Sequence, residues 1–115
     1  MAMNIQIFGT NKSFDTKKAQ RWFKERGIRF QMIDMKEKGM SRGEFDNVCR
    51  AVGGWAKLVD ENAKDKDTLA LLKWLDESQQ ADKLIENQQL FRQPIVRNGR
   101  QATVGYCPEV WEKWE

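Results

Sequence analysis

The chain of 115 residues has no histidine and only two cysteines, Cys49 and Cys107. The absence of histidine excludes a Ser-His-Asp triad, a Cys-His pair and every histidine-bearing zinc site, and two thiols are too few for a four-cysteine zinc site. We therefore expect no metal site, and no residue pattern in the sequence indicates a bound cofactor.

Long apolar runs are also missing. No hydrophobic stretch approaches the roughly 18–20 residues that span a membrane, and no signal-peptide pattern opens the chain. We expect a cytoplasmic protein without a membrane partner. Hydrophobic residues make up 40% and charged residues 32% of the sequence, a balance typical of a folded globular protein. The length predicts one domain over residues 1–115.

The net charge of +3 is unevenly distributed. Lysine and arginine exceed the acids in residues 1–50, and the acids are in excess in residues 51–90. The total is less basic than that of most nucleic-acid-binding domains, so a nucleic-acid partner is not predicted. The first helix and the loop before it are basic, with Lys12, Lys17, Lys18, Arg21 and Lys24. We interpret this as a solvated helix face, with an anion site or an acidic partner as the alternative.

The first third of the chain reads as strand, helix, strand. An apolar segment over residues 4–8 predicts a short buried strand, and a helix with one apolar face follows over about 15–26. Gly27 stands where a helix C-cap glycine is expected. Residues 28–35 alternate as a second strand.

The middle of the chain has no proline and reads as helical. Ser41 and Glu44 form a capping-box pattern, which begins a helix that ends at Gly53 and Gly54. Residues 55–91 follow as helices throughout. The five tryptophans are spaced as core or half-buried residues.

The pattern changes at Pro94. Two apolar runs, 95–96 and 102–104, flank Asn98-Gly99, which predicts a hairpin with a type I′ turn. Pro108 then begins a last amphipathic helix. The order of elements describes an α/β, thioredoxin-like fold (βαβ plus ββα) with a helical insertion at about 41–91 between the two halves.

Several separated segments, in the right order, resemble the ArsC/Spx family of thioredoxin-fold proteins, which contains arsenate reductases, Spx transcriptional regulators and glutaredoxin-like relatives. They are residues 7–19, 23–28, 33–41, 94–100 and 104–106. The resemblance covers nearly the whole chain and thins between about 55 and 90.

The resemblance places Ser13 where the family's reductases carry their nucleophilic cysteine, just before the first helix. A helix N-terminus lowers a thiol's pKa and so favours the thiolate. A serine hydroxyl cannot form a disulfide, and without histidine it has no base to activate it. The second cysteine of the Cys-x-x-Cys relatives corresponds to Thr16, so no redox pair remains. Ser13 is either natural or an engineered replacement, and we favour the first.

The same resemblance implies an active-site loop and cleft, formed by Thr10, Asn11, Lys12, Ser13, Thr16, Lys17, Arg92, Gln93 and Pro94. It also predicts a cis peptide bond before Pro94. The reductases' arginine before that proline is replaced by Gln93, and Arg92 lies one place earlier, on the other face of an extended strand. Residues 59–62 are acidic where the reductases carry a second arginine. Tyr106 and Cys107 stand where the reductases carry a third arginine. A glutaredoxin-like or Spx-like role is therefore favoured over arsenate reduction.

Neither remaining thiol replaces the missing one. Cys49 lies on the apolar face of a predicted helix and is interpreted as a buried structural thiol. Cys107 is expected to be more exposed and incidental, with a functional thiol of lowered pKa as the alternative. An internal disulfide is not expected.

Two functional hypotheses follow. The first is a redox-silent binding or regulatory module that uses the old active-site cleft or the basic first helix. The second is a glutaredoxin-like or arsenate-reductase-like thiol oxidoreductase whose nucleophilic cysteine is replaced by Ser13. The expected partner at the cleft is a thiol donor or a protein, and contact with RNA polymerase is implied by the Spx likeness alone.

Overall fold

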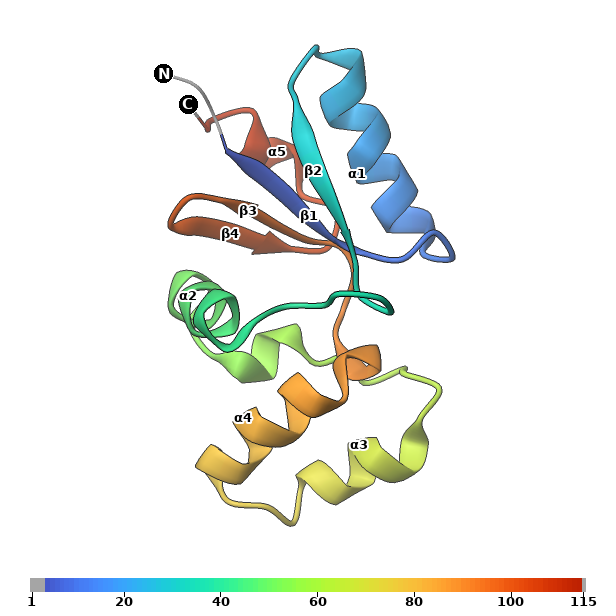
Figure 1. The fold of residues 1–115 in the computed structure, drawn as a ribbon, viewed down its shortest axis with the longest axis vertical. Helices are drawn as coiled ribbons and strands as arrows, with labels where there is room; N and C mark the ends of the chain where they lie inside the picture. The colour runs from blue at the N-terminus through green and yellow to red at the C-terminus, as the bar shows by residue number, and fades with distance from the viewer. Residues whose placement is uncertain (1–3, 115) are drawn as a thin grey trace.

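The computed structural model describes residues 4–114, which form a four-stranded sheet with helices on both faces (Figure 1). In chain order the elements are β1 (Ile5–Gly9), α1 (Phe14–Glu25), β2 (Phe30–Asp34), α2 (Arg42–Val52), the 3-10 helix η1 (Trp55–Leu58), α3 (Lys66–Leu72), α4 (Glu77–Glu86), the 3-10 helix η2 (Gln88–Leu90), β3 (Ile95–Asn98), β4 (Gln101–Val104) and α5 (Pro108–Trp111).

The sheet has the order β2-β1-β3-β4. β1 pairs with β2 in parallel, whereas β1 with β3 and β3 with β4 are antiparallel. The first two strands with α1 make the βαβ half, and the hairpin with α5 makes the ββα half. The predicted thioredoxin-like fold is confirmed, with the helical segment inserted between β2 and β3.

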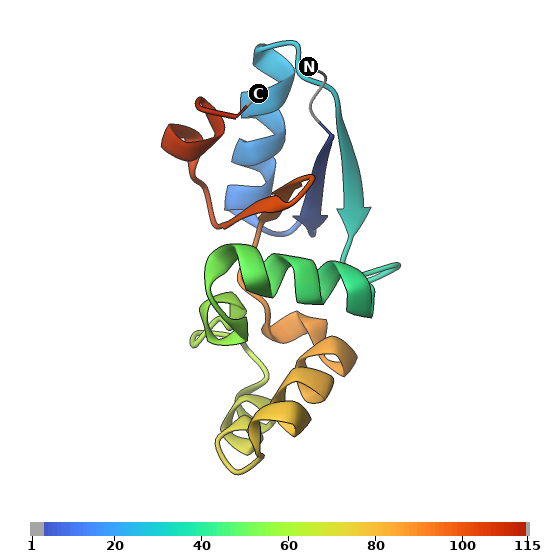
Figure 2. The same ribbon diagram turned by 90° about the vertical axis from the view of Figure 1, so that its left-hand side faces the viewer.

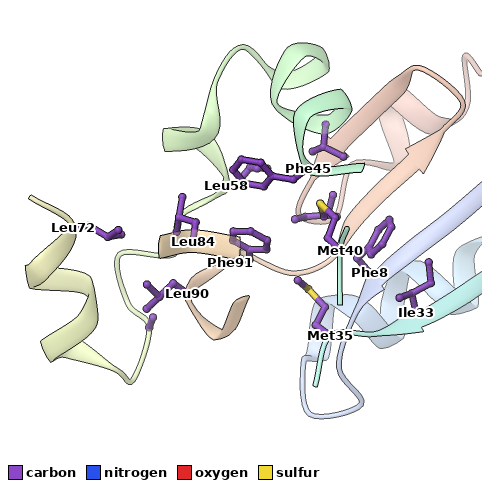
Figure 3. Close-up of a cluster of buried hydrophobic side chains, with 13 residues drawn as sticks. Phe8, Ile33, Met35, Met40, Phe45, Leu58, Leu72, Leu84, Leu90 and Phe91 are labelled. Carbon is purple, nitrogen blue, oxygen red and sulfur yellow. The ribbon is translucent and has the colours of Figure 1, made fainter. Parts of the chain in front are cut away.

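Each face of the sheet has its own hydrophobic core, because alternate side chains of a strand point to opposite faces. Ile5 and Ile7 of β1 belong to the cluster under α1 and α5, which includes Phe23 and Trp111. Phe8 belongs to the other cluster, which continues from the sheet into the insertion (Figure 3). The labelled members of this second cluster are Phe8, Ile33, Met35, Met40, Phe45, Leu58, Leu72, Leu84, Leu90 and Phe91.

The insertion extends beyond one end of the sheet, opposite the two chain termini (Figures 1 and 2). The described chain is therefore elongated, with extents of 44 × 26 × 24 Å. The two ends of the insertion are joined by an isolated antiparallel bridge between Val59 and Phe91. The amide of Asp60 donates to the Leu90 carbonyl at 2.7 Å, and that of Arg92 donates to Leu58 at 2.7 Å. This bridge returns the chain to the sheet at the start of β3.

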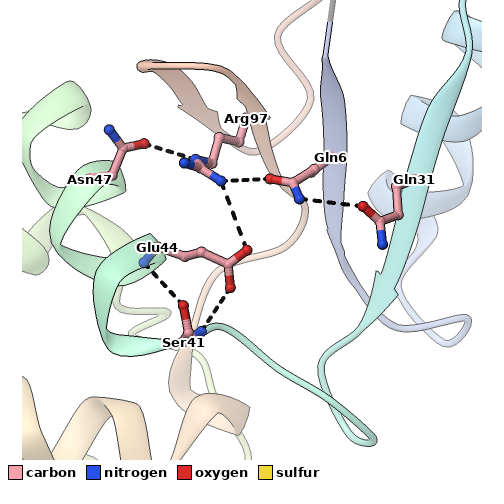
Figure 4. A network of polar contacts seen from close by, with 6 residues as sticks. All are labelled: Gln6, Gln31, Ser41, Glu44, Asn47 and Arg97. Atoms are coloured by element: carbon pink, nitrogen blue, oxygen red, sulfur yellow. Dashed lines mark hydrogen bonds and ion pairs between the residues drawn. The ribbon is translucent and has the colours of Figure 1, made fainter.

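A polar network fixes α2 against the sheet (Figure 4). The Arg97 guanidinium donates to Gln6 Oε1 at 2.7 Å and to Asn47 Oδ1 at 2.8 Å, and lies 3.8 Å from Glu44. Glu44 also closes the capping box with Ser41 that the sequence predicts. One half-buried cation thus joins β1, β3 and α2.

Three expectations about local structure were wrong. Residues 55–91 are not helical throughout, since an irregular segment separates η1 from α3. The hairpin turn is not type I′ around Asn98-Gly99, because Asn98 pairs with Gln101 in the ladder and only Gly99 of the loop has a positive φ, 61°. Trp74 is 86% exposed rather than buried, because α3 ends at Leu72, before the apolar spacing does.

Within residues 4–114, no helix has both the length and the apolar character needed to cross a membrane. The same residues contain no group of three or more histidine, cysteine, aspartate or glutamate side chains placed to hold a metal ion.

Candidate functional site

Ser13 is the N-cap of α1. Its backbone is extended (φ −82°, ψ 121°), and its Oγ accepts a hydrogen bond from the Thr16 amide at 3.2 Å. The Ser13 amide donates to the Thr10 carbonyl at 3.1 Å, which closes the loop between β1 and α1. Serine is among the preferred N-cap residues, because its short side chain reaches an otherwise unpaired amide of the first turn. The hydroxyl at the predicted nucleophile position therefore has a structural task.

Gln93 ties this loop to the segment before β3. Its Oε1 accepts from the Thr10 amide at 2.8 Å and from the Thr10 hydroxyl at 3.0 Å. Thr10 is buried, so both of its donors depend on this one side chain. The Gln93–Pro94 peptide bond is cis, which confirms the prediction from the family resemblance. The loop and the proline turn thus form one hydrogen-bonded unit.

Thr16 lies behind the loop, at the contact between α1 and β1. It is fully buried, and its Oγ1 has no hydrogen-bond partner among the described residues. A Cβ atom added to Gly9 would lie 2.4 Å from Thr16 Oγ1 and 2.8 Å from its Cγ2. Gly9 therefore allows the first turn of α1 to approach the sheet closely.

A hollow of about 440 Å³ opens beside Ser13, between the loop and the insertion. Its lining combines Ser13 and Gln93 with residues of the insertion: Asp60, Asn62, Ala63, Lys64, Asp65, Gln89 and Phe91. Two carboxylates against one ammonium group give this lining an acidic character. Gln93 also lines a second hollow of about 450 Å³, together with Thr10 and the loop after β2.

Asp65, in the lining of the first hollow, accepts hydrogen bonds with both of its carboxylate oxygens. It caps α3 by accepting from the Thr68 amide at 3.2 Å, and its other oxygen accepts from Gln89 Nε2 at 3.1 Å. The hydrogen bonds from Thr68 and then Gln89 hold the pKa of the Asp65 carboxyl below its ordinary value. A hydrogen-bonded carboxylate thus lines the same hollow as Ser13.

The predicted site residues divide into two groups. Ser13 and Gln93 line one hollow, Thr10 stands directly behind them, and Thr16 and Pro94 are buried beside them. Asn11, Lys12, Lys17 and Arg92 are exposed and do not line that hollow.

Sequence reasoning missed the part of the lining that the insertion contributes, from Asp60 to Phe91. The acidic character of residues 59–62 is visible in the sequence, but their position beside Ser13 depends on long-range pairing such as the Val59–Phe91 bridge. That pairing joins segments far apart in the chain and leaves no local pattern in the sequence.

Cys49 and Cys107 are both free thiols of intermediate burial, and neither lines the hollow. Burial, with a smaller effect of Asp46, raises the pKa of Cys49 from 9.0 to about 11. Burial, then Glu109, also raises the pKa of Cys107, whose Sγ donates to the Val104 carbonyl at 3.3 Å. The alternative of a lowered pKa at Cys107 was therefore wrong.

The sequence model of the ArsC family matches residues 8–114 of this chain. The global transcriptional regulator Spx 2 of Oceanobacillus iheyensis is 26% identical in an alignment 112 positions long, which covers 90% of this chain and 78% of the relative.

Solved structures show the same fold. An ArsC-family-related protein from Bacteroides fragilis superposes with a TM-score of 0.84 at 24% identity, over 98% of each chain. An arsenate reductase from Vibrio cholerae superposes with a TM-score of 0.78 at 22% identity, over 96% of each chain.

Proposed function

Since the chain belongs to the ArsC family, we propose that it is a redox-silent member that binds a partner protein in the hollow beside Ser13. The observation that carries the proposal is the bond from the Thr16 amide to Ser13 Oγ. A hydroxyl that caps the helix stabilises the loop without any thiol chemistry. The two thiols of the chain lie elsewhere and have raised pKa values, so neither supplies a thiolate to this site at neutral pH.

The lining of the hollow favours a particular kind of partner. Asp60 and Asp65 bring negative charge to it, and Asn62 and Gln89 bring amide groups. Such a surface suits an extended segment that carries hydrogen-bond donors and positive charge. The charge of this lining is negative, whereas arsenate or another oxyanion needs positive charge. Arg92, the one arginine predicted for the cleft, is exposed and lies outside the hollow. Arsenate reduction is therefore not part of the proposal.

The alternative is a thiol oxidoreductase whose cysteine is replaced by Ser13. It is supported by the position of Ser13 at the N-terminus of a twelve-residue helix, where a thiolate would be stabilised. The test is the Ser13→Cys variant in a background with Cys49→Ala and Cys107→Ala, titrated by its rate of alkylation with iodoacetamide. A pKa below ~7.5 together with turnover in a thiol-coupled reductase assay supports the alternative, whereas a pKa near ~8.5 contradicts it.

A regulatory role is supported by the likeness to a transcriptional regulator. Following that likeness, we propose cytoplasmic RNA polymerase as the partner to test first. The assay is capture of purified polymerase by the immobilised chain, with Asp65→Asn and Gln89→Ala as variants in the hollow. Retention that both variants weaken supports the assignment, and the absence of any retained polymerase subunit refutes it.

A further inference from the structure

Among residues 4–114, β2 is an edge strand of the sheet, and no other strand pairs with its outer side. It pairs with β1 on one side only, and it lies at the margin of the sheet in Figure 2. Because backbone groups alternate along a strand, and the Met35 amide donates to Gly9 of β1, the groups of Gln31 and Ile33 also point toward β1. Those of Phe30 and Met32 point outward. An edge of this kind can accept another strand.

The basic face of α1 borders this open edge. A hollow of about 620 Å³ is lined by Phe30 of β2 and by five residues of α1, namely Lys17, Gln20, Arg21, Lys24 and Glu25. Three of these carry positive charge and one carries negative charge. Lys17, Arg21 and Lys24 form no ion pair with any described residue. Lys18, on the same helix, instead lies over the Tyr106 ring, 4.5 Å from its centroid.

The spacing of the three cations matches an extended peptide. Lys17 and Arg21 are four residues apart on the helix, which is about 6 Å along its axis, and Lys24 follows after about 4.5 Å. Side chains at alternate positions of a strand are about 6.6 Å apart on one face. A strand laid along β2 would therefore place every second side chain near one of these cations.

We infer that the outer edge of β2 and the basic face of α1 together form a docking surface for an extended acidic segment of a partner protein, which adds to the sheet as a fifth strand. Main-chain hydrogen bonds to Phe30 and Met32 would fix its direction and register. Alternating acidic side chains would pair with Lys17, Arg21 and Lys24. This surface is separate from the hollow beside Ser13 and does not depend on the function proposed for it.

A peptide fits these features better than a nucleic acid does. The outward amides and carbonyls of Phe30 and Met32 offer a strand ladder, which the backbone of a nucleic acid cannot complete. Only three cations line the hollow, over about 10 Å of helix, and the chain as a whole carries only +3. Nucleic-acid binding rests on a larger, clustered positive surface.

The test uses a fluorescein-labelled decapeptide of alternating glutamate and valine, titrated with the full chain and followed by fluorescence anisotropy at low salt. We expect saturable binding that weakens as the salt concentration rises. A decapeptide of the same sequence with N-methyl groups on alternate residues keeps the charge but cannot pair as a strand. We expect it to bind at least about tenfold more weakly, because the main-chain hydrogen bonds are lost.

Two triple variants separate this surface from general charge. Lys17→Gln, Arg21→Gln and Lys24→Gln together should weaken binding of the decapeptide about tenfold. Lys57→Gln, Lys66→Gln and Lys73→Gln remove the same charge from the insertion and should change it less than twofold. Amide hydrogen exchange tests the same surface without mutation. Saturating decapeptide should slow exchange at the Met32 amide. Exchange at the amides of β4, at the opposite edge of the sheet, should stay the same.

Four results would overturn the inference. They are equal binding of the N-methylated peptide, equal effects of the two triple variants, unchanged exchange at Met32 under saturation, and no binding of the decapeptide at all. Two further outcomes assign the surface to another occupant and also refute it. One is binding of a single-stranded oligonucleotide that is tighter than binding of the decapeptide and depends on Lys17, Arg21 and Lys24. The other is protection of the Met32 amide that increases with protein concentration in the absence of peptide, which indicates a second copy of this chain.

Discussion

The close approach of Gly9 to Thr16 predicts that a methyl group added at Gly9 will destabilise the fold, and that a smaller side chain at Thr16 will restore its stability. In Gly9→Ala the new Cβ would meet Thr16 Oγ1 at 2.4 Å and Cγ2 at 2.8 Å, both closer than such contacts allow. Thr16 is fully buried in the first turn of α1, where a β-branched side chain has little rotamer freedom. Gly9 has no positive φ, so the cost is steric rather than conformational. Overpacking of this kind costs about 2–3 kcal/mol of unfolding free energy.

The compensating change is Thr16→Ala. Alone, this change lowers the free energy of unfolding by about 1 kcal/mol because a buried methyl group is lost. It raises it by about as much because a buried hydroxyl without a partner is removed. In the double variant the methyl group introduced by Gly9→Ala occupies the vacated space, so stability should return close to that of the parent chain. The expected coupling energy between the two sites is about 2 kcal/mol.

The assay is equilibrium unfolding in urea, followed by tryptophan fluorescence, for the parent chain, both single variants and the double variant. Unchanged m-values would show that the midpoint shifts report stability. A double variant whose destabilisation equals the sum of the single effects would refute the reasoning. So would a Gly9→Ala variant as stable as the parent chain.

Three other predictions concern the same region and the two thiols. Thr16→Val should stabilise the chain by about 1 kcal/mol in urea unfolding, because a methyl group replaces a buried hydroxyl without a partner; a loss of stability would mean that the hydroxyl is hydrogen-bonded. Gln93→Leu should lower the free energy of unfolding by about 2 kcal/mol, because both donors of Thr10 lose their acceptor. Gln93→Glu should lower it much less, because a carboxylate accepts the same two hydrogen bonds. Equal losses in the two variants would exclude that explanation. Cys49, with its pKa raised from 9.0 to about 11, should have a thiolate fraction about 100-fold smaller at neutral pH than an ordinary thiol. Its alkylation should therefore be slow until the pH rises through about 11, and Cys107 should also react slowly, as mass spectrometry of iodoacetamide-treated protein can measure; fast alkylation of either thiol at pH 7 contradicts the assigned burial.

The two halves of the fold and the first helix of the insertion could be predicted because their signals are local. The capping box at Ser41 and the apolar spacing of α1 each depend on a few neighbouring residues. The family resemblance places Ser13 just before α1, and its residue type suits an N-cap. In the hairpin, Gly99 was placed correctly in the turn, but its neighbour was assigned wrongly, because the pairing of Asn98 with Gln101 decides which residues form the loop.

The rest of the insertion and the lining of the site could not be predicted from local patterns. α3 and α4 are short, and each begins at an aspartate cap within a largely polar segment. Contacts over a long separation decide the rest: Gln93 reaches Thr10 across 83 residues of chain, and the bridge to Phe91 carries the acidic segment to Ser13. Apolar spacing also misplaced Trp74, because a helix ends where its backbone pairing ends.

The central claim is that the site around Ser13 binds without redox chemistry, and the most direct test is turnover of the chain with its present sequence. NADPH consumption is measured in glutaredoxin-coupled and thioredoxin-coupled assays, with arsenate and with a mixed disulfide as substrates. The Cys49→Ala/Cys107→Ala variant reports any contribution of the two remaining thiols. We predict rates equal to those without protein for both chains, since Ser13 cannot form a disulfide. Sustained turnover by the parent chain would contradict the account, and its loss in the Cys49→Ala/Cys107→Ala variant would assign the activity to one of those two thiols.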